Sequence, residues 1–297
     1  MSYGSPTGPD RVQEYYTHIR RGRPPSPEQL EELVGRYEAI GGTTALAANT
    51  ADQLEAISRA LEADERQWVV ASGTKHSSPS IEDAALAMVE AGAQAVVGVV
   101  LAPHFSAASV GEYHRRAAEA LASRPEVSYR GVRHWHLLDE LVAFHAAQVR
   151  TALAEMPRRT KVVFTAHSLP ERVLVDDPYP EQLARSAAAV AALAGLPRWS
   201  GWGVAWQSAG ATPEPWRGPD LLEVMSDLAD TGRSEGLLVV PHGFTSEHLE
   251  VLYDIDIEAL AAAERLGLEL RRTAVVGDDP TVMGALARRC ATHLEAP

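Results

Sequence analysis

The run Leu238-Val239-Val240-Pro241-His242-Gly243-Phe244-Thr245-Ser246 is an apolar strand that ends in a Pro-His turn and leads through hydroxyl residues into a helical pattern. The run Val99-Val100-Leu101-Ala102-Pro103-His104-Phe105-Ser106 repeats the same order of residue types. This internal repeat predicts two similar lobes that meet near residue 150. The alternative is that the two runs share only the turn chemistry of strand ends.

Short β-rich runs alternate with longer segments rich in Ala, Glu and Leu along the chain. The β-rich runs are 67–71, 95–102, 161–166, 202–206, 236–240 and 273–277, and helical patterns cover 26–40, 80–91, 110–122, 137–155, 180–193 and 219–228. This alternation predicts an α/β fold with parallel sheets. We expect lobes at 1–150 and 151–297, with a C-terminal helix able to pack back on the first lobe.

The composition is that of a globular protein, with 45% hydrophobic residues among 297. The net charge of −13 disfavours a nucleic-acid partner, because phosphate binding needs a basic face. The first residues have neither a basic start nor an apolar run, and no stretch suits a bilayer span, so we expect a cytoplasmic protein without a membrane segment. A single cysteine, Cys290, cannot by itself hold a zinc ion or an iron–sulfur cluster, so any metal must bind to nitrogen and oxygen.

Side chains that follow predicted parallel strands are the first candidates for a binding site. Parallel sheets bind ligands beyond the carboxyl ends of their strands, where the loops converge. That rule selects seven residues: Tyr3, Lys75, His76, His104, His167, Ser208 and His242.

Three carboxylates recur every four residues after the predicted strand 236–240, at Glu250, Asp254 and Glu258. On an α-helix they form one stripe, and like charges at this spacing destabilise a helix by roughly 0.2–0.5 kcal/mol per pair unless a cation binds. His167 follows the predicted strand 161–166 and should point into the cleft. An imidazole and carboxylates suit a borderline divalent metal such as Fe(II) and also accept protons. The alternatives are a solvated acidic face and a structural histidine.

Aromatic, histidine and arginine groups elsewhere are ambiguous. Trp206 and Trp216 flank a Gly/Pro loop, which suits either a wall for an aromatic ligand or ordinary core packing of one indole. His134-Trp135-His136 has the spacing of a metal pair without a nearby carboxylate, so we interpret it as structural. Arg20-Arg21-Gly22-Arg23 is either a solvated helix end or an anion site. Dinucleotide, Walker, zinc-protease and α/β-hydrolase motifs are absent from the sequence.

The run Phe164-Thr165-Ala166-His167-Ser168-Leu169-Pro170 resembles the ferrochelatase signature, and so do 206–208, 215–219 and 248–254. Near the amino end, Tyr3-Gly4-Ser5-Pro6, 15–23 and 36–42 resemble the coproporphyrin ferrochelatases of Gram-positive bacteria. The resemblance covers essentially the whole chain. It implies two Rossmann-like lobes of the chelatase kind with an active-site cleft between them. The implied reaction is insertion of Fe(II) into coproporphyrin III to give coproheme in haem biosynthesis.

The resemblance also implies roles for individual residues. His167 and Glu250 are implied as catalytic residues that bind the incoming iron, and one of the pair accepts the pyrrole protons. Asp254 and Glu258 would continue the metal's path, and Tyr3 would ligate the iron of the product. Contacts with the porphyrin are implied for Tyr3, Arg20, Arg21, Arg36, Tyr37, Thr44, Lys75, Tyr113 and Ser208.

We therefore expect His167 and Glu250 to face each other across a cleft wide enough for a flat tetrapyrrole. The four propionates of coproporphyrin would give Arg20 and Arg21 an anionic partner. The expected partners are coproporphyrin III and Fe(II), the latter as substrate. We expect no prosthetic group, no iron–sulfur cluster and no nucleic acid, and a monomeric protein.

The sequence departs from the family's pattern in several places, none of which removes a proposed catalytic group. The family has apolar residues of a first strand ahead of its Tyr-Gly motif, whereas Met1 lies almost at that motif, so the strand is shortened or the start lies upstream. His242 stands where an aliphatic residue is usual. Two other functions remain open, a cobalt or sirohydrochlorin chelatase and a non-catalytic tetrapyrrole or haem carrier.

Overall fold

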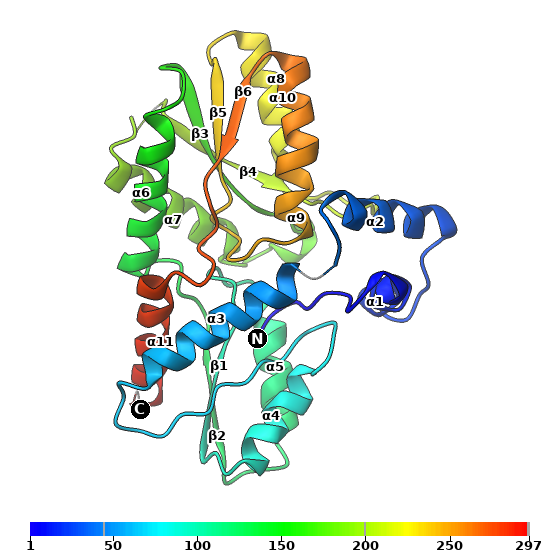
Figure 1. Ribbon diagram of the computed structural model, residues 1–297, viewed down its shortest axis with the longest axis vertical. Coiled ribbons are helices and arrows are strands. Elements are labelled where there is room, and N and C mark those ends of the chain that lie inside the picture. The colour runs from blue at the N-terminus through cyan, green and yellow to red at the C-terminus, as the bar shows by residue number, and fades with distance from the viewer. Residues whose placement is uncertain (44, 199, 296–297) are drawn as a thin grey trace.

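The computed structural model describes residues 1–43, 45–198 and 200–295, and its strands form two sheets, one above the other in Figure 1. The larger sheet has the order β4-β3-β5-β6, built from β3 (Thr160–His167), β4 (Trp202–Gln207), β5 (Gly236–Val240) and β6 (Glu269–Arg272). The smaller sheet pairs β1 (Ala95–Val99) with β2 (Ser128–Val132). Every pairing between these strands is parallel, which confirms the predicted α/β class.

Helices start where the local sequence can satisfy their free N–H groups. Ser26 and Gln29 form a capping box on α2, Ser80 accepts from the Asp83 N–H at the start of α4, and Asp220 caps α8. The helices are α1 (Val12–Ile19), α2 (Pro27–Ala39), α3 (Ala45–Leu61), α4 (Ile81–Glu90), α5 (Val110–Leu121), α6 (Asp139–Leu153), α7 (Tyr179–Ala194), α8 (Leu221–Thr231), α9 (Leu249–Leu252), a π-helix (Asp254–Ala259), α10 (Leu260–Leu266) and α11 (Pro280–Glu295), with 3₁₀ turns at Pro9–Arg11 and Glu171–Val173.

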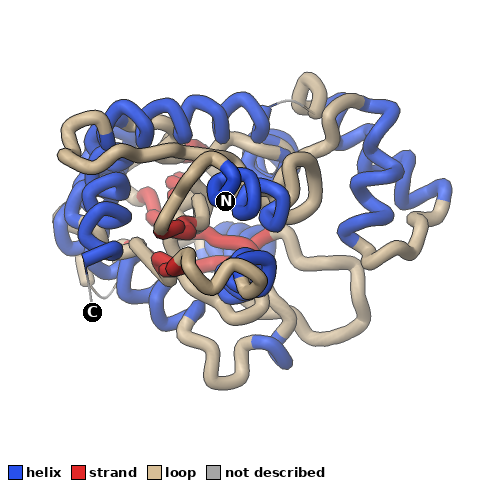
Figure 2. Tube along the Cα trace, turned by 90° about the horizontal axis from the view of Figure 1, so that it is seen from below, coloured by secondary structure: helices blue, strands red, loops and turns tan. Residues whose placement is uncertain are grey.

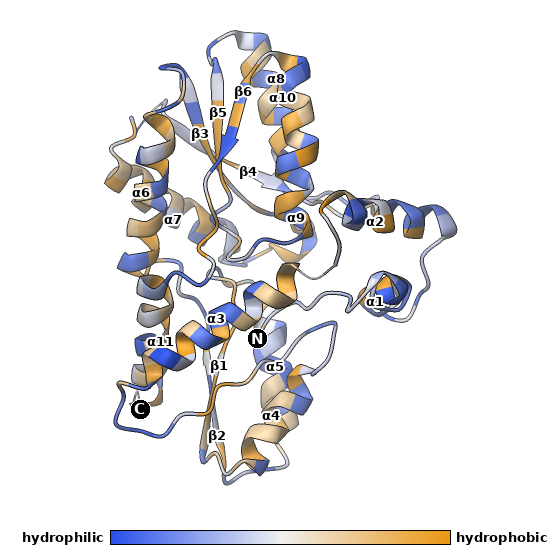
Figure 3. Ribbon diagram, viewed as in Figure 1, coloured by the Kyte–Doolittle hydropathy of each residue, from blue (hydrophilic) through white to orange (hydrophobic). Residues whose placement is uncertain are grey.

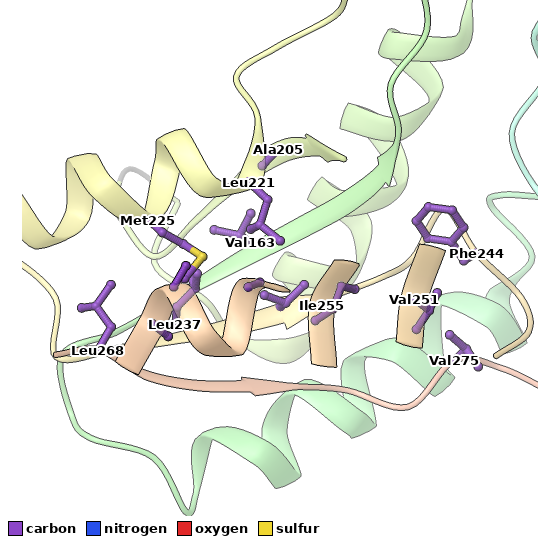
Figure 4. Close-up of a cluster of buried hydrophobic side chains, with 14 residues drawn as sticks. Val163, Ala205, Leu221, Met225, Leu237, Phe244, Val251, Ile255, Leu268 and Val275 are labelled. Carbon is purple, nitrogen blue, oxygen red and sulfur yellow. The ribbon is translucent and has the colours of Figure 1, made fainter. Parts of the chain in front are cut away.

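The larger sheet is covered on both faces, because its central strands send alternate side chains to opposite sides. Val163, Leu237 and Val239 pack with α8, the π-helix and α10, as Figure 4 shows for the labelled side chains. Phe164 and Leu238 lie in the second core, with α6 and α7. All five residues of β5 are buried, which explains its uninterrupted apolar sequence. Each such side chain contributes roughly 1.5–3 kcal/mol on burial.

The smaller sheet is covered by helices from both ends of the chain. α3 and α11 pack against each other, and α11 also contacts β1 and β2. α6 instead packs on α7 and β5. Viewed from below, helices surround the strands (Figure 2). α1 and α2 project from this body, and α2 mixes hydrophobic with hydrophilic residues along its length (Figure 3).

Two of the predicted strands are wrong, and several observed elements, among them β2, β6, α3 and α10, were not predicted. Residues 273–277 form no strand, because β6 lies just before them. Residues 67–71 form no ladder, because a cavity of about 570 Å³, lined partly by Trp68, Val70 and Val97, separates them from β1. The first residues bridge this gap: the Met1 amino group donates to the Val99 carbonyl at 2.6 Å, and Ser2 pairs with Thr74. β2 and α3, which we did not predict, have weak apolar patterns.

No helix in the described ranges combines the length and the apolarity that a membrane span requires.

Candidate active site

His167 is the last residue of β3, at the carboxyl edge of the larger sheet. Its backbone carbonyl accepts a hydrogen bond from the Tyr179 hydroxyl at 3.2 Å, and its ring Nδ1 lies against the Ser168 carbonyl. The Ser168 N–H donates to the Gln207 carbonyl at 2.8 Å. Because a carbonyl can only accept, Nδ1 must carry the proton, so Nε2 of the neutral ring is a proton acceptor or metal ligand.

Glu250 lies between two imidazoles. Its Oε1 is 3.5 Å from Nε2 of His167, and its Oε2 is 3.6 Å from Nε2 of His248. His248 is oriented by a 2.9 Å bond between its Nδ1 and the Ser246 carbonyl. Burial would raise the pKa of Glu250, but the two imidazoles outweigh it and lower that pKa to about 2. Conversely, burial would lower the pKa of His248, but Glu250 raises it. The carboxylate is therefore ionised throughout the neutral range.

The expected placement of this pair across the cleft is wrong. At 3.5 Å, no macrocycle fits between His167 and Glu250, so both belong to one wall. The reason is the strand order: β3 ends in His167, β5 leads into α9, and β3 and β5 are neighbours in the sheet. A flat ligand has to lie beside the pair, not between its members.

Asp254 begins a π-helix immediately after α9. The Ser208 hydroxyl donates to its carboxylate, and the Arg36 guanidinium lies 3.7 Å from it. Burial raises the pKa of Asp254 to about 6, and the charges of Glu250 and Glu258 add to this, while Ser208 and Arg36 oppose it. Glu258 is exposed. The predicted carboxylate stripe is thus graded, from a partly buried end at Glu250 to a solvated end at Glu258.

A pocket of about 230 Å³ opens beside Glu250 and is walled by aromatic side chains of the N-terminal segment. Tyr3 is 41% exposed there, and its ring lies 4.6 Å from that of His76. Tyr37 is buried, and burial together with the charge of Glu250 raises its pKa to about 12. The Tyr15 hydroxyl donates to the Gly4 carbonyl at 2.8 Å, which fixes the turn after Tyr3. His248, Leu249 and Glu250 complete the lining from the other sheet.

The other residues predicted to contact the porphyrin differ in how deeply they are buried. Lys75 Nζ lies 2.8 Å from Glu112 and 5.5 Å from the centre of the buried Tyr113 ring. Arg20 is partly buried, with its guanidinium 5.5 Å from the Tyr16 ring centre, and Arg21 is exposed. Thr44 lies outside the described residues.

The structure does not bring two of the strand-end candidates into this site. His104 and His242 are buried, at 3% and 2% exposure, between the two sheets. Trp206 is also buried, and it packs against Tyr179 in a core cluster, so core packing is the correct interpretation of this indole. Sequence reasoning missed His248, although it stands two residues before Glu250. Within the described part of the chain, no three His, Cys, Asp or Glu side chains form a ready-made metal cluster.

Comparisons place this fold among the chelatases. The solved structure of SirB from Bacillus subtilis with Fe³⁺ matches 82% of this chain and 90% of its own, with a TM-score of 0.56 and 19% identity. The family model described as Ferrochelatase matches residues 1–294.

Two curated relatives have the same printed name, Coproporphyrin III ferrochelatase. The protein from Anoxybacillus flavithermus is 40% identical, over 99% of this chain and 95% of its own. The protein from Bacillus subtilis is 39% identical, over 97% of this chain and 94% of its own. The fold and the site thus define a chelatase. The chain belongs to the ferrochelatase family.

Proposed function

We propose that this enzyme inserts Fe(II) into coproporphyrin III and so forms coproheme. The observation that carries the proposal is the contact of His167 Nε2 with the Glu250 carboxylate at 3.5 Å, beside a pocket walled by Tyr3 and Tyr37. The relatives named above support coproporphyrin III as the porphyrin.

Metallation requires that two pyrrole protons leave and that a partly dehydrated metal arrives. Nε2 of His167 is a free acceptor, since Nδ1 is engaged by the Ser168 carbonyl. We assign proton acceptance to His167, and iron binding to His167 and Glu250 together. The imidazoles of His167 and His248 lower the pKa of Glu250 to about 2, so the carboxylate can bind a cation without first losing a proton.

The path of the incoming metal follows the carboxylates from the exposed Glu258 through Asp254 to Glu250. A carboxyl with a pKa near 6 exchanges its proton readily at neutral pH, so Asp254 can take up and release a cation. Tyr3, on the N-terminal side of the pocket, would ligate the iron of the product.

Most of the proposed contacts with the edge of the macrocycle come from residues in the N-terminal part of the chain. We assign propionate contacts to Arg20, Arg21 and Arg36, and porphyrin contacts to Tyr37, Thr44, Lys75, Tyr113 and Ser208. Such edge contacts can supply roughly 1–5 kcal/mol of ring distortion, which exposes the pyrrole nitrogens. We also propose two lobes that close on the ring, 1–150 and 151–297, with two helices crossing this boundary: α6 packs on β5 of the second lobe, and α11 packs on β1 and β2 of the first.

The deciding experiment is anaerobic incubation of the full chain with Fe(II) and coproporphyrin III, followed by absorption spectra. We expect conversion to coproheme, which His167→Ala abolishes while porphyrin binding, measured by fluorescence quenching, persists. His293→Ala, on α11, is the matched control and should convert normally. Conversion of sirohydrochlorin with Co(II) but not of coproporphyrin would indicate the other chelatase, and tight binding without conversion would indicate a carrier.

A further inference from the structure

Five histidines form a row of rings between the two sheets, which we call the histidine row: His134, His136, His104, His242 and His145. Successive ring centroids are 5.0, 5.3, 5.2 and 6.4 Å apart. His134 is exposed, and the other four are 2–3% exposed. The row therefore runs from solvent into the interior, and none of its members takes part in the chemistry proposed above.

The row crosses the junction between the sheets. His104 follows β1, and His134 and His136 follow β2, whereas His145 lies on α6 and His242 follows β5. Direct bonds across the junction lie beside it: the Phe105 N–H donates to Gln182 and the Ala107 N–H donates to Asp177, each at 2.7 Å. A change in the charge of the histidine row therefore affects the packing between the two sheets.

Most ring nitrogens of the row lack a hydrogen-bond partner among the described residues. Both nitrogens of His136 and of His145 are unpaired, as is Nδ1 of His104 and of His242. The two that are engaged meet neutral groups: His104 Nε2 lies 2.8 Å from the Ser186 hydroxyl, and His242 Nε2 lies 3.3 Å from the Leu183 carbonyl. None of these contacts supplies a counter-charge for a protonated ring.

Three arginines act electrostatically on the outer rings of the row. Arg133 on the β2 loop, Arg185 on α7 and Arg289 on α11 all act on His134, and Arg185 also acts on His136. From α7, Tyr179 meets His104 edge-on at 6.4 Å. The nearby carboxylate of Asp177 is taken up by Ser106, Ala107 and the Tyr179 N–H.

We propose that the histidine row is an acid-sensitive joint, which holds the two sheets together while its rings are neutral and releases them when the rings take up protons. Four adjacent buried imidazoles cannot all become cations when the described charges that act on them are further cations and the nearby Asp177 carboxylate is already hydrogen-bonded to other groups. Separation of the sheets lets water reach the rings. The joint is independent of the iron chemistry, since it shares no residue with the site.

The direction of the effect follows from proton linkage. Burial, followed by neighbouring positive groups, lowers the pKa of His136 to about 4 and that of His145 to about 3, and burial lowers the pKa of His242 to about 4. The unfolded chain binds protons with an ordinary histidine pKa, so stability is full above about pH 7 and is lost as the pH falls through about 6.5. At pH 5.5 each of these residues raises the unfolding constant about 10-fold, and the three together about 10³-fold.

The test compares unfolding constants at pH 7.5 and pH 5.5, from urea denaturation of the full chain. In His145→Leu the ratio of the two constants should be about 10-fold smaller than in wild type, and in His145→Leu/His242→Leu about 100-fold smaller. His293→Gln, a histidine outside the row, should leave the ratio unchanged. Ratios equal to wild type in both row variants would overturn the proposal.

Two measurements on the wild-type chain keep the test valid if a variant does not fold. In ¹³C-histidine NMR, the rings of His136, His145 and His242 should not titrate between pH 7.5 and 5.5, and ordinary titration near 6.5 would overturn the proposal. Hydrogen exchange, corrected for intrinsic rates, should show the Phe105 and Ala107 amides losing protection on acidification before the β3–β5 ladder does. If the Phe105 and Ala107 amides and the β3–β5 ladder lost protection together, the row would affect only global stability. That result would refute the proposed joint.

Discussion

Asp254→Asn separates the stability of the fold from the proposed function of the carboxylate path. Asp254 is only 11% exposed, and its pKa rises from 3.8 to about 6, so its ionised form opposes folding at neutral pH. Linkage gives a destabilisation of about 3 kcal/mol at pH 7.5, about 2 kcal/mol at pH 5 and less than about 1 kcal/mol at pH 4. An amide keeps an acceptor for the Ser208 hydroxyl and removes the charge. The variant should therefore be more stable by up to about 3 kcal/mol at pH 7.5, and slower in iron insertion.

The assay is urea denaturation followed by tryptophan fluorescence at several pH values, with linear extrapolation to water. The matched control is Asp256→Asn, two residues along the same π-helix. Asp256 lies 2.6 Å from Arg272, whose guanidinium is 17% exposed and also binds Glu247 at 3.0 Å. Removing this partner should lower stability by about 1–3 kcal/mol. A gain for Asp254→Asn that does not shrink between pH 7.5 and pH 4, or a loss at pH 7.5, would refute the reasoning.

Two further predictions concern backbone positions. Gly243→Ala would place the new Cβ 2.4 Å from the Cβ of Ala166, next to His167. The free energy of unfolding, measured by urea denaturation, should therefore fall by about 1–3 kcal/mol. A decrease of less than about 0.5 kcal/mol would contradict this contact. Burial lowers the pKa of the Met1 amino group to about 6, so acetylation of Met1, which removes the charge, should stabilise the chain by about 1 kcal/mol at pH 7 and by more near pH 6. Equal stability of acetylated and free chains at pH 6 would contradict it.

The sequence predicted the parallel α/β class and most elements, because β5 and the central part of β3 are buried on both faces and are rich in apolar residues. It failed where an element depends on its neighbours. The segment 67–71 has strand composition, but a ladder needs a partner at about 4.8 Å, and a cavity lies where that partner would be. β2, with a half-buried pattern and a glycine, forms because β1 offers it an edge.

The histidines show that the positions of polar residues, too, cannot be predicted from local sequence alone. His104, His242 and His167 all follow strands, and the strand-end rule treats them alike. What separates them is the arrangement of the two sheets: the first two lie buried where the sheets meet, whereas His167 lies at the carboxyl edge beside the pocket. That arrangement is a tertiary property, which no local spacing contains.

The carboxylates show how side chains chosen by their spacing can have a geometry that differs from the predicted one. An α-helix places residues four apart on one face, and on that basis Glu250, Asp254 and Glu258 form a single stripe. The π-helix that begins at Asp254 changes the turn, so Glu250 meets His167, Asp254 meets Ser208 and Arg36, and Glu258 faces solvent. Because π-turns gather at functional sites, the irregular step is itself part of what aims these carboxylates in different directions. The residue types predicted which side chains to examine, but the directions in which these side chains point depend on the order of β3 and β5 in the sheet.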